Sequence, residues 1–228
     1  PNRLVKAAMT EGLADERSNA TAAHATLHSA WAAGGTGTLI TGNVQIDRRY
    51  QERPGNVAID MSEAPCSTPP RSALSAWAAA GAERGAVTIV QLGHAGRQST
   101  GMINMSPKGP GTVPLRNLPK TAYGAPTAFT VAEMEDIVAR FAYAATVCAE
   151  CGFDGVQIHA AHGYLLSSFM KPLANNRVAL QRVDGSGVEA DDPYCATLRD
   201  RAKPLLDVVA AVQEALRGAA SGSANRAA

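Results

Sequence analysis

The sequence predicts an α/β protein built on a parallel β-sheet. Four apolar segments of strand length each precede a segment with helical spacing, and this alternation is typical of βα units. Each of the four strand segments is apolar on both faces, as expected for strands covered on both sides rather than for hairpins with one solvated face. The pattern is compatible with a closed barrel and with an open sheet.

The composition is that of a globular protein with its own core. The chain has 228 residues, of which 46% are hydrophobic and 18% charged, which is enough to bury the core of one domain. Its 21 Lys and Arg and 20 Asp and Glu give a net charge of +1 without a basic block, so no nucleic-acid partner is expected. No apolar stretch approaches about 18 residues and no secretory signal pattern is present, so we expect no membrane association and a cytoplasmic location.

The predicted elements follow from two kinds of pattern. Strands are expected where apolar residues run without interruption, at residues 4–10, 36–44, 87–92 and 155–159. Helices are expected where apolar residues recur at helical spacing, at residues 18–33, 72–82, 131–150 and 198–216. Ser18 is the expected N-cap of the first helix and Gly34-Gly35 its stop, and Thr130 with Glu133 predicts a capping box.

The loops after the first two strands are expected at Glu11-Gly12 and at Gly42-Asn43. Residues 99–128 hold five prolines and four glycines, which predicts a long loop of the kind that is usually functional or disordered. Residues 218–228 predict a flexible tail of small residues.

Polar side chains gather at the ends of the third and fourth predicted strands. Side chains two residues apart share a face of a strand, so Gln91 lies on the face of Ile89, and Gln157 lies on the face of His159. Ligand-binding groups collect at the carboxyl ends of parallel strands. We therefore expect these side chains to point into a barrel interior or a sheet crevice.

The densest group of reactive side chains is His159-Ala160-Ala161-His162-Gly163-Tyr164. Its two imidazoles and one phenol can supply two hydrogen-bond donors and a proton donor to one small ligand. One alternative is a pair of structural histidines that bond loop carbonyls. Another is a metal-dependent lyase or hydrolase, although His-x-x-His here lacks a nearby acidic or thiol ligand of suitable spacing.

Two other motifs predict structure rather than chemistry. Cys148 and Cys151 have C-x-x-C spacing but lie at a helix end without a second pair, which favours packed thiols. With Cys66 and Cys195 they are too few and too unevenly spaced for a disulfide framework, so all are expected to be free. The glycine-rich segment 34–37 precedes a strand, whereas a phosphate-binding loop follows one.

Four segments, taken in order along nearly the whole chain, resemble the old yellow enzyme family of FMN-dependent oxidoreductases. They are Ala8-Met9-Thr10-Glu11, Leu39-Ile40-Thr41-Gly42, Gln91-Leu92-Gly93-His94-Ala95-Gly96-Arg97 and residues 153–169 (FDGVQIHAAHGYLLSSF). The last of these is the most specific.

The resemblance implies a (β/α)8 TIM-barrel fold, here truncated to about the first four βα units, with FMN at the carboxyl ends of the strands. It implies NAD(P)H, either NADH or NADPH, as the electron donor. Ala8, Met9 and Thr10 would line the flavin, and Thr10 would tune its redox state from near the reactive edge of the ring. Gly42 and Gln91 would bond the polar edge of the ring.

The resemblance also implies a substrate, an α,β-unsaturated carbonyl compound, and no metal. His159 and His162 would hold the carbonyl oxygen of the substrate while charge builds on it. Tyr164 would give a proton to the α-carbon, because a phenol with a pKa of about 10 is protonated at neutral pH.

One departure from the family pattern follows Asn175-Asn176-Arg177. The family runs directly from there into an acidic-tyrosine-double-glycine turn, whereas residues 178–191 intervene here as an insertion, or as an error in the gene model. The turn itself reads Asp192-Pro193-Tyr194-Cys195-Ala196. Because Cys195 and Ala196 replace glycines, a distorted loop is expected if the backbone needs a positive φ there.

The other departure concerns extent. Only four of the eight barrel strands are predicted, and the loops after strands seven and eight, which bind phosphate in such barrels, are not among them. Pro1 in place of Met also indicates residues upstream. Residues 1–217 would then form a partial domain that binds FMN weakly or not at all and is incomplete or inactive alone. Its open edges favour aggregation or a homo-oligomer. The alternative to an enzyme is a non-catalytic half-barrel that persists as an interaction or vestigial product.

Overall fold

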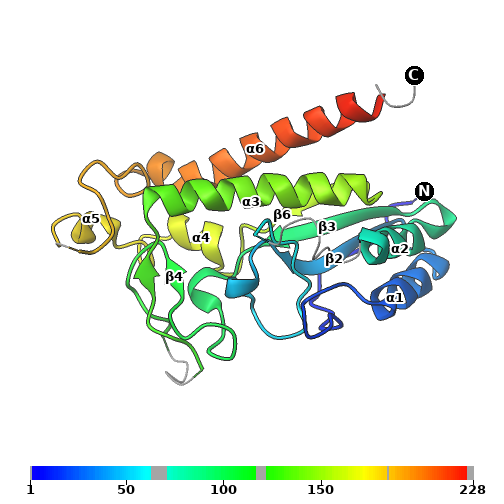
Figure 1. The fold of residues 1–228 in the computed structure, drawn as a ribbon, viewed down its shortest axis with the longest axis horizontal. Helices are drawn as coiled ribbons and strands as arrows, with labels where there is room; N and C mark the ends of the chain where they lie inside the picture. Colours follow the sequence, from blue (N-terminus) through cyan, green and yellow to red (C-terminus); the bar gives the residue numbers. More distant parts are fainter. Residues whose placement is uncertain (1, 63–70, 117–121, 184, 225–228) are drawn as a thin grey trace.

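A parallel sheet of four strands forms the centre of the fold, in the order β1-β2-β3-β6. The computed structural model describes residues 2–62, 71–116, 122–183 and 185–224 (Figure 1). The strands of the sheet are β1 (Val5–Lys6), β2 (Thr38–Gln45), β3 (Val87–Gly93) and β6 (Gly155–Ile158). The α-helices are α1 (Ala22–Ala33), α2 (Arg71–Gly81), α3 (Val131–Glu150), α4 (Leu165–Met170), α5 (Arg177–Leu180) and α6 (Leu198–Ala224). The predicted parallel α/β architecture is confirmed.

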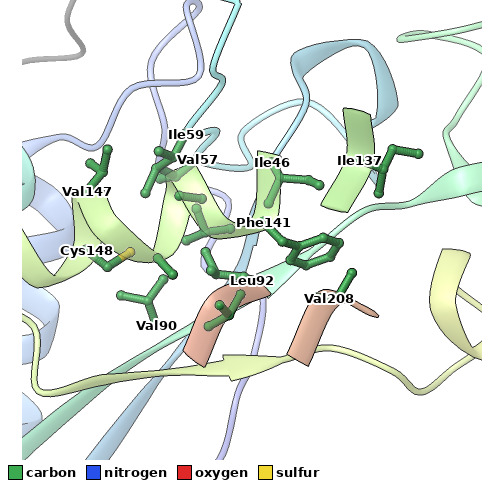
Figure 2. Packing of buried hydrophobic residues seen from close by; sticks show 14 of the residues in the cluster. Ile46, Val57, Ile59, Val90, Leu92, Ile137, Phe141, Val147, Cys148 and Val208 are labelled. Carbon is green, nitrogen blue, oxygen red and sulfur yellow. The ribbon is translucent and has the colours of Figure 1, made fainter. Parts of the chain in front are cut away.

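One face of the sheet is covered by helices and holds the core. On β3, Thr88, Val90 and Leu92 are at most 1% exposed. Thr88 lies against Gly81 of α2, while α3 and α6 lie side by side over Val90 and Leu92 (Figure 1). Figure 2 shows Val90 and Leu92 close to Phe141 of α3 and Val208 of α6.

The opposite face of the sheet is only half-buried. Val87, Ile89 and Gln91, which alternate with the buried residues of β3, all keep intermediate exposure. This is the face on which the sequence predicts ligand-binding side chains at the strand ends. The prediction that the strands are covered on both faces therefore holds for only one face within the described part of the chain.

Four predicted elements are confirmed to within one residue at each end: α2, β3, α3 and β6. The predicted capping box begins α3, since the Thr130 amide donates to Glu133 Oε2 at 2.8 Å and the Glu133 amide donates to Thr130 Oγ1 at 3.2 Å. Gly34 caps the end of α1, and Gly35 follows with φ +88°. The local signals for helix ends were sufficient at these positions.

The prediction of a buried first strand at residues 4–10 is wrong. Only Val5 and Lys6 pair with β2, and Leu4 and Val5 are 62% and 57% exposed. The reason is the position of β1 at the edge of the sheet, where its second side has no neighbouring strand among the described residues.

Two predicted boundaries near the N-terminus are also wrong. Thr21, not Ser18, is the N-cap of α1, and its amide donates to His24 Nδ1 at 3.1 Å. The second strand, expected at 36–44, spans Thr38–Gln45, so its end is right to within one residue. Its expected exit through Gly42-Asn43 is wrong, because an irregularity between Ile40 and Asn43 shifts the register and lets pairing with β3 resume.

The segment 99–128, predicted as a loop, contains regular structure. It holds β4 (Lys108–Gly109) and β5 (Thr127–Ala128), which form a second, two-stranded parallel sheet. Elsewhere in the described ranges lie three short 3-10 helices: η1 (Arg48–Tyr50), η2 (Glu83–Gly85) and η3 (Gly96–Gln98). The last helix, α6, continues beyond the predicted end at residue 216, so residues 218–224 of the predicted tail are helical.

The insertion 178–191 forms a loop that is closed at its base. Leu180 and Val188 from within it pack against Ala128. In the turn that follows, neither Cys195 nor Ala196 has a positive φ, and the expected distortion of the loop stays a prediction. Two non-glycine residues therefore build the turn without using the left-handed region.

The described cysteines, Cys148, Cys151 and Cys195, are free and buried, as predicted, whereas Cys66 lies outside the described residues.

Within the part of the chain that the structure describes, no helix combines the length and the apolar character that crossing a membrane requires.

Candidate active site

The three aromatic side chains of the His159-to-Tyr164 segment converge at the carboxyl end of β6. The ring centroids of His159 and Tyr164 lie 5.0 Å apart, those of His159 and His162 lie 5.3 Å apart, and those of His162 and Tyr164 lie 6.4 Å apart. One small ligand can therefore contact all three rings.

A tight backbone turn brings these rings together. His162 and Gly163 have φ values of +57° and +81°, and Tyr164 then serves as the N-cap residue of α4. Gln98 Nε2 donates to the His162 carbonyl at 2.9 Å, and the Gly163 amide donates to Ser167 Oγ at 2.9 Å. Glycine is favoured at position 163 because of its φ of +81°, which L side chains rarely adopt. A left-handed histidine costs free energy that these contacts offset, and such strain is concentrated at functional sites.

His159 is a neutral hydrogen-bond donor. Its Nδ1 accepts from the Ala161 amide at 3.3 Å, which places the proton of the neutral ring on Nε2. Burial and the neighbouring His162 lower the pKa of His159, while the charge of Glu52 acts in the opposite direction. The Nε2–H group is therefore suited to an incoming carbonyl oxygen at neutral pH.

Tyr164 is held as a protonated phenol. Burial raises the pKa of Tyr164 above its ordinary value, and so do the charge of Glu52 and a hydrogen bond to Glu52. A phenol with a raised pKa keeps its proton until a strongly basic atom forms beside it. This is the property required of an acid that protonates a carbanion-like carbon.

The structure joins Thr10, Asn43 and Glu52 in one hydrogen-bond network. The Thr10 hydroxyl lies 3.1 Å from Glu52 Oε2 and 3.0 Å from Asn43 Oδ1, and Asn43 Nδ2 donates to the same Glu52 oxygen at 2.9 Å. The Thr10 hydroxyl, predicted to lie at the edge of a flavin ring, is thus held beside a carboxylate whose charge also acts on the Tyr164 phenol.

Gln91 lies on the half-buried face of the sheet, as predicted. Its Nε2 donates to Gln157 Oε1 at 2.8 Å, so the two amides present one free acceptor and one free donor group to that face. Of the other predicted residues, Ala8 is half-buried and Met9 is 58% exposed on the extended segment after β1.

The backbone amide of Gly42 is already engaged. It donates to Glu11 Oε1 at 2.8 Å, and a Cβ at position 42 would lie 2.5 Å from the Met9 carbonyl oxygen. Glycine is required here because the backbone of Met9 occupies the space that a Cβ atom would need. Gly42 therefore does not offer a free donor to a ligand while Glu11 keeps this position.

Sequence patterns did not identify Glu52 or Asn43 as site residues, and they did not link Glu11 to Gly42. Glu52 lies in a polar segment with Arg48, Arg49 and Arg53 in which charge alone does not distinguish it. Asn43 was predicted as part of a loop, although it lies within β2 and is 7% exposed. A polar residue inside an apolar strand was the one signal that could have drawn attention to it.

The donor set fits the ring of a flavin in part. The Thr10 hydroxyl, the Gln91 amide and the His159 Nε2–H group lie on or beside the half-buried face and suit the polar atoms of an isoalloxazine ring and of a bound carbonyl compound. The Gly42 amide does not fit without a movement of Glu11. In the described ranges, no group of three His, Cys, Asp or Glu side chains is arranged to hold a metal ion.

Comparison with protein families gives one match over almost the whole chain. The model of the NADH:flavin oxidoreductase / NADH oxidase family matches residues 1–220. Among curated proteins, the NADH-dependent flavin oxidoreductase iliE of Hypocrea jecorina is 37% identical over 93% of this chain and 53% of its own length. The chain thus spans about half the length of this relative.

Solved structures show the same fold. Morphinone reductase superposes with a TM-score of 0.76 at 21% identity, over 94% of this chain and 55% of that protein. An old yellow enzyme homologue from Zymomonas mobilis superposes with a TM-score of 0.74 at 26% identity, over 92% of this chain and 55% of that protein. The described α/β unit therefore has the fold of part of an old yellow enzyme TIM barrel.

Proposed function

The chain belongs to the NADH:flavin oxidoreductase / NADH oxidase family. From this premise we propose that it carries the residues that hold the flavin ring and the residues that hold the substrate in an FMN-dependent ene-reductase. The electron donor would be NADH or NADPH, and the acceptor would be an α,β-unsaturated carbonyl compound. The convergence of His159, His162 and Tyr164 at the end of β6 carries this proposal.

Each residue of this cluster has a distinct part in the proposed reaction. When bound, the flavin supplies a hydride to the β-carbon of the substrate. His159 and His162 would hold the carbonyl oxygen and stabilise the negative charge that develops on it through their imidazole N–H groups. His159 is buried at 7% exposure, whereas His162 is exposed. The Tyr164 hydroxyl gives its proton to the α-carbon, and such acid assistance contributes on the order of 10²- to 10⁴-fold in rate.

Thr10 and Gln91 would hold the ring. Thr10 lies in the segment after β1, and its hydroxyl bonds Glu52. The side-chain amide of Gln91 is oriented by its hydrogen bond to Gln157. Phosphate binding in barrels of this class belongs to loops after later strands, so we propose that the chain alone recognises the ring of FMN weakly and is incomplete as a catalyst. Pairing of two copies through the exposed edges of the sheet stays a prediction.

Flavin titration tests the ring site. We expect weak quenching of flavin fluorescence with equal affinity for FMN and riboflavin, since the ring-side residues do not contact the phosphate. Gln91→Leu should weaken binding of both, and Gln181→Leu, at a half-buried glutamine bonded to Ala190 in the insertion, should leave it unchanged. Tight binding with a strong preference for FMN would contradict the proposed incompleteness, and no binding of either flavin would contradict the ring site.

A second experiment tests the substrate site without turnover. The chain has 5 histidines, so their imidazole proton signals can be resolved by NMR during addition of 2-cyclohexenone. We expect the two signals removed by His159→Gln and His162→Gln to move, while His24, His28 and His94, which are at most 2% exposed, do not. Equal movement of all signals, or of none, would contradict the assignment of this cluster as a carbonyl site.

A further inference from the structure

A side chain from the segment after β3 reaches the turn that carries His162. Gln98, the last residue of η3, donates from Nε2 to the His162 carbonyl at 2.9 Å, although the two residues are 64 positions apart. Because a carbonyl oxygen can only accept, this bond fixes the orientation of the Gln98 amide, with Nε2 toward His162. Gln98 therefore ties the loop after β3 to the loop after β6.

The backbone around Gln98 is anchored on both sides. Before it in the chain, the carbonyl of His94 accepts from the Leu165 amide of α4 at 3.1 Å. After it, Ser99 is fully buried and its hydroxyl donates to the Gln51 carbonyl at 3.0 Å. The side chain of Gln98 thus bonds the His162 carbonyl from a fixed base.

The two histidines of the candidate site differ in what holds their rings. The His159 ring is buried, and its Nδ1 accepts from the Ala161 amide at 3.3 Å. The His162 ring is exposed, and no hydrogen bond from another described residue fixes it. The direction of the His162 ring therefore depends on the backbone of the turn that carries it.

That turn is strained and needs contacts to keep its shape. His162 has a φ of +57°, which a residue with a side chain adopts at a cost in free energy. Within the segment, Ser167 Oγ accepts from the Gly163 amide at 2.9 Å. In the described part of the chain, Gln98 is the one residue outside positions 159–168 that hydrogen-bonds residues 161–163.

We propose that Gln98 is a positioning residue of the proposed reaction. Its bond to the His162 carbonyl holds the left-handed turn, which keeps the His162 ring 5.3 Å from the His159 ring, between centroids, so that both can bond one carbonyl oxygen. This inference rests on the proposed function, because that function assigns carbonyl binding to the two histidines. Gln98 acts through the backbone of His162.

The first test measures the ring geometry without a ligand. The His159 and His162 rings meet edge to face, so their protons should give a nuclear Overhauser effect in the wild type. We expect Gln98→Leu to lose most of this signal, and Gln98→Lys to restore it because an ammonium group can donate to the same carbonyl. Gln181→Leu is the matched control and should leave the signal unchanged. If Gln98→Leu lacks native circular dichroism, Gln98→Asn, whose amide is one methylene too short to reach, takes its place.

The second test measures the consequence for ligand binding by addition of 2-cyclohexenone. We expect Gln98→Leu to weaken enone binding by about 2- to 10-fold, as for the loss of one hydrogen bond. The enone should also shift the His162 imidazole signal less than in the wild type, while its effect on His159 persists, because the Ala161 amide still holds that ring. A general loss of structure would reduce both shifts equally.

The outcomes separate this inference from the proposed function. An unchanged Overhauser effect in Gln98→Leu with native circular dichroism, or an equal loss of both histidine shifts, would overturn the role of Gln98 even if flavin and enone bind the wild type as proposed. Loss of the effect in Gln98→Leu, its return in Gln98→Lys and a selective loss of the His162 shift would support both proposals. If the wild type binds no enone, the role of Gln98 in the reaction is overturned together with the proposed function, whatever the Overhauser effect shows about the turn.

Discussion

Arg177 and Asp192 form a fully buried ion pair, with 0% exposure of both side chains, although they are 15 positions apart in the sequence. Arg177 Nε donates to Asp192 Oδ1 at 2.9 Å, and a second guanidinium nitrogen donates to the other carboxylate oxygen. Arg177 also donates to the carbonyls of Phe129 and Pro110, at 2.7 and 3.2 Å. The pair closes the base of the insertion 178–191 and ties it to the segment before α3.

Removing one partner of this pair should strongly destabilise the chain. Arg177→Met leaves Asp192 charged and buried, and breaking a buried pair in this way costs about 3–5 kcal/mol. The free energy of unfolding in urea measures this loss. Lys203→Ala, which removes an exposed pair with Asp207, should change it by less than about 1 kcal/mol. A similar small change for Arg177→Met would show that the buried pair does not stabilise the fold.

The insertion should be removable while the pair is kept. Deletion of residues 179–191 leaves Arg177 and Asp192 on either side of Val178, and the bond from Asn175 Nδ2 to the Tyr194 carbonyl at 3.0 Å still connects the two sides. The deletion loses the packing of Leu180 and Val188 but shortens a loop, so we expect a smaller loss of unfolding free energy than for Arg177→Met, below about 3 kcal/mol. Loss of cooperative unfolding in the deletion variant would show that the insertion is part of the folding unit.

The features that could be predicted from the sequence are those that depend on residues close together in the chain. The β3 and β6 runs, the Thr130 capping box and the His159-to-Tyr164 cluster depend on neighbours within a few positions, and the structure has them as expected. Glu52 contacts Thr10 across 42 positions, and Glu11 contacts Gly42 across 31. Strand periodicity predicts which face a side chain takes but not which loop folds back onto that face. These contacts therefore required the tertiary structure.

His94 should make stability depend on pH between about 4 and 6.5. Burial lowers the pKa of His94 to about 4, with smaller effects from Asp47, Arg140, Arg49 and Asp60. The folded state therefore binds fewer protons than the unfolded state in this window. The stabilisation is fully present above pH 6.5 and is lost as pH falls toward 4, by up to about 3 kcal/mol.

The structure explains why His94 resists protonation. Its Nδ1 accepts from the Gly96 amide at 3.0 Å, and its ring packs against Tyr50 and Phe129 at 4.5 and 5.8 Å between centroids. Within the described residues its Nε2 has no hydrogen-bond partner. Urea unfolding of the wild type and of His94→Gln at several pH values isolates the contribution of His94 to the free energy of unfolding, because the buried carboxylates contribute equally in both proteins. Parallel stability curves for the two proteins between pH 4 and 6.5 would contradict this account.

Glu11 should compete with a flavin for the Gly42 amide. Burial raises the pKa of Glu11, but hydrogen bonds from His28 and Gly42 and the charge of Lys6 together lower it, so a carboxylate occupies this amide at neutral pH. Glu11→Ala frees the amide for a flavin carbonyl oxygen, and one hydrogen bond of about 0.5–1.5 kcal/mol corresponds to FMN binding tighter by about 2- to 10-fold. Glu11→Gln is the matched variant, because its side-chain oxygen still occupies the amide and the affinity should rise less. Fluorescence titration with FMN measures both, and binding by Glu11→Ala that is no tighter than that of the wild type would show that Gly42 does not bond the flavin ring.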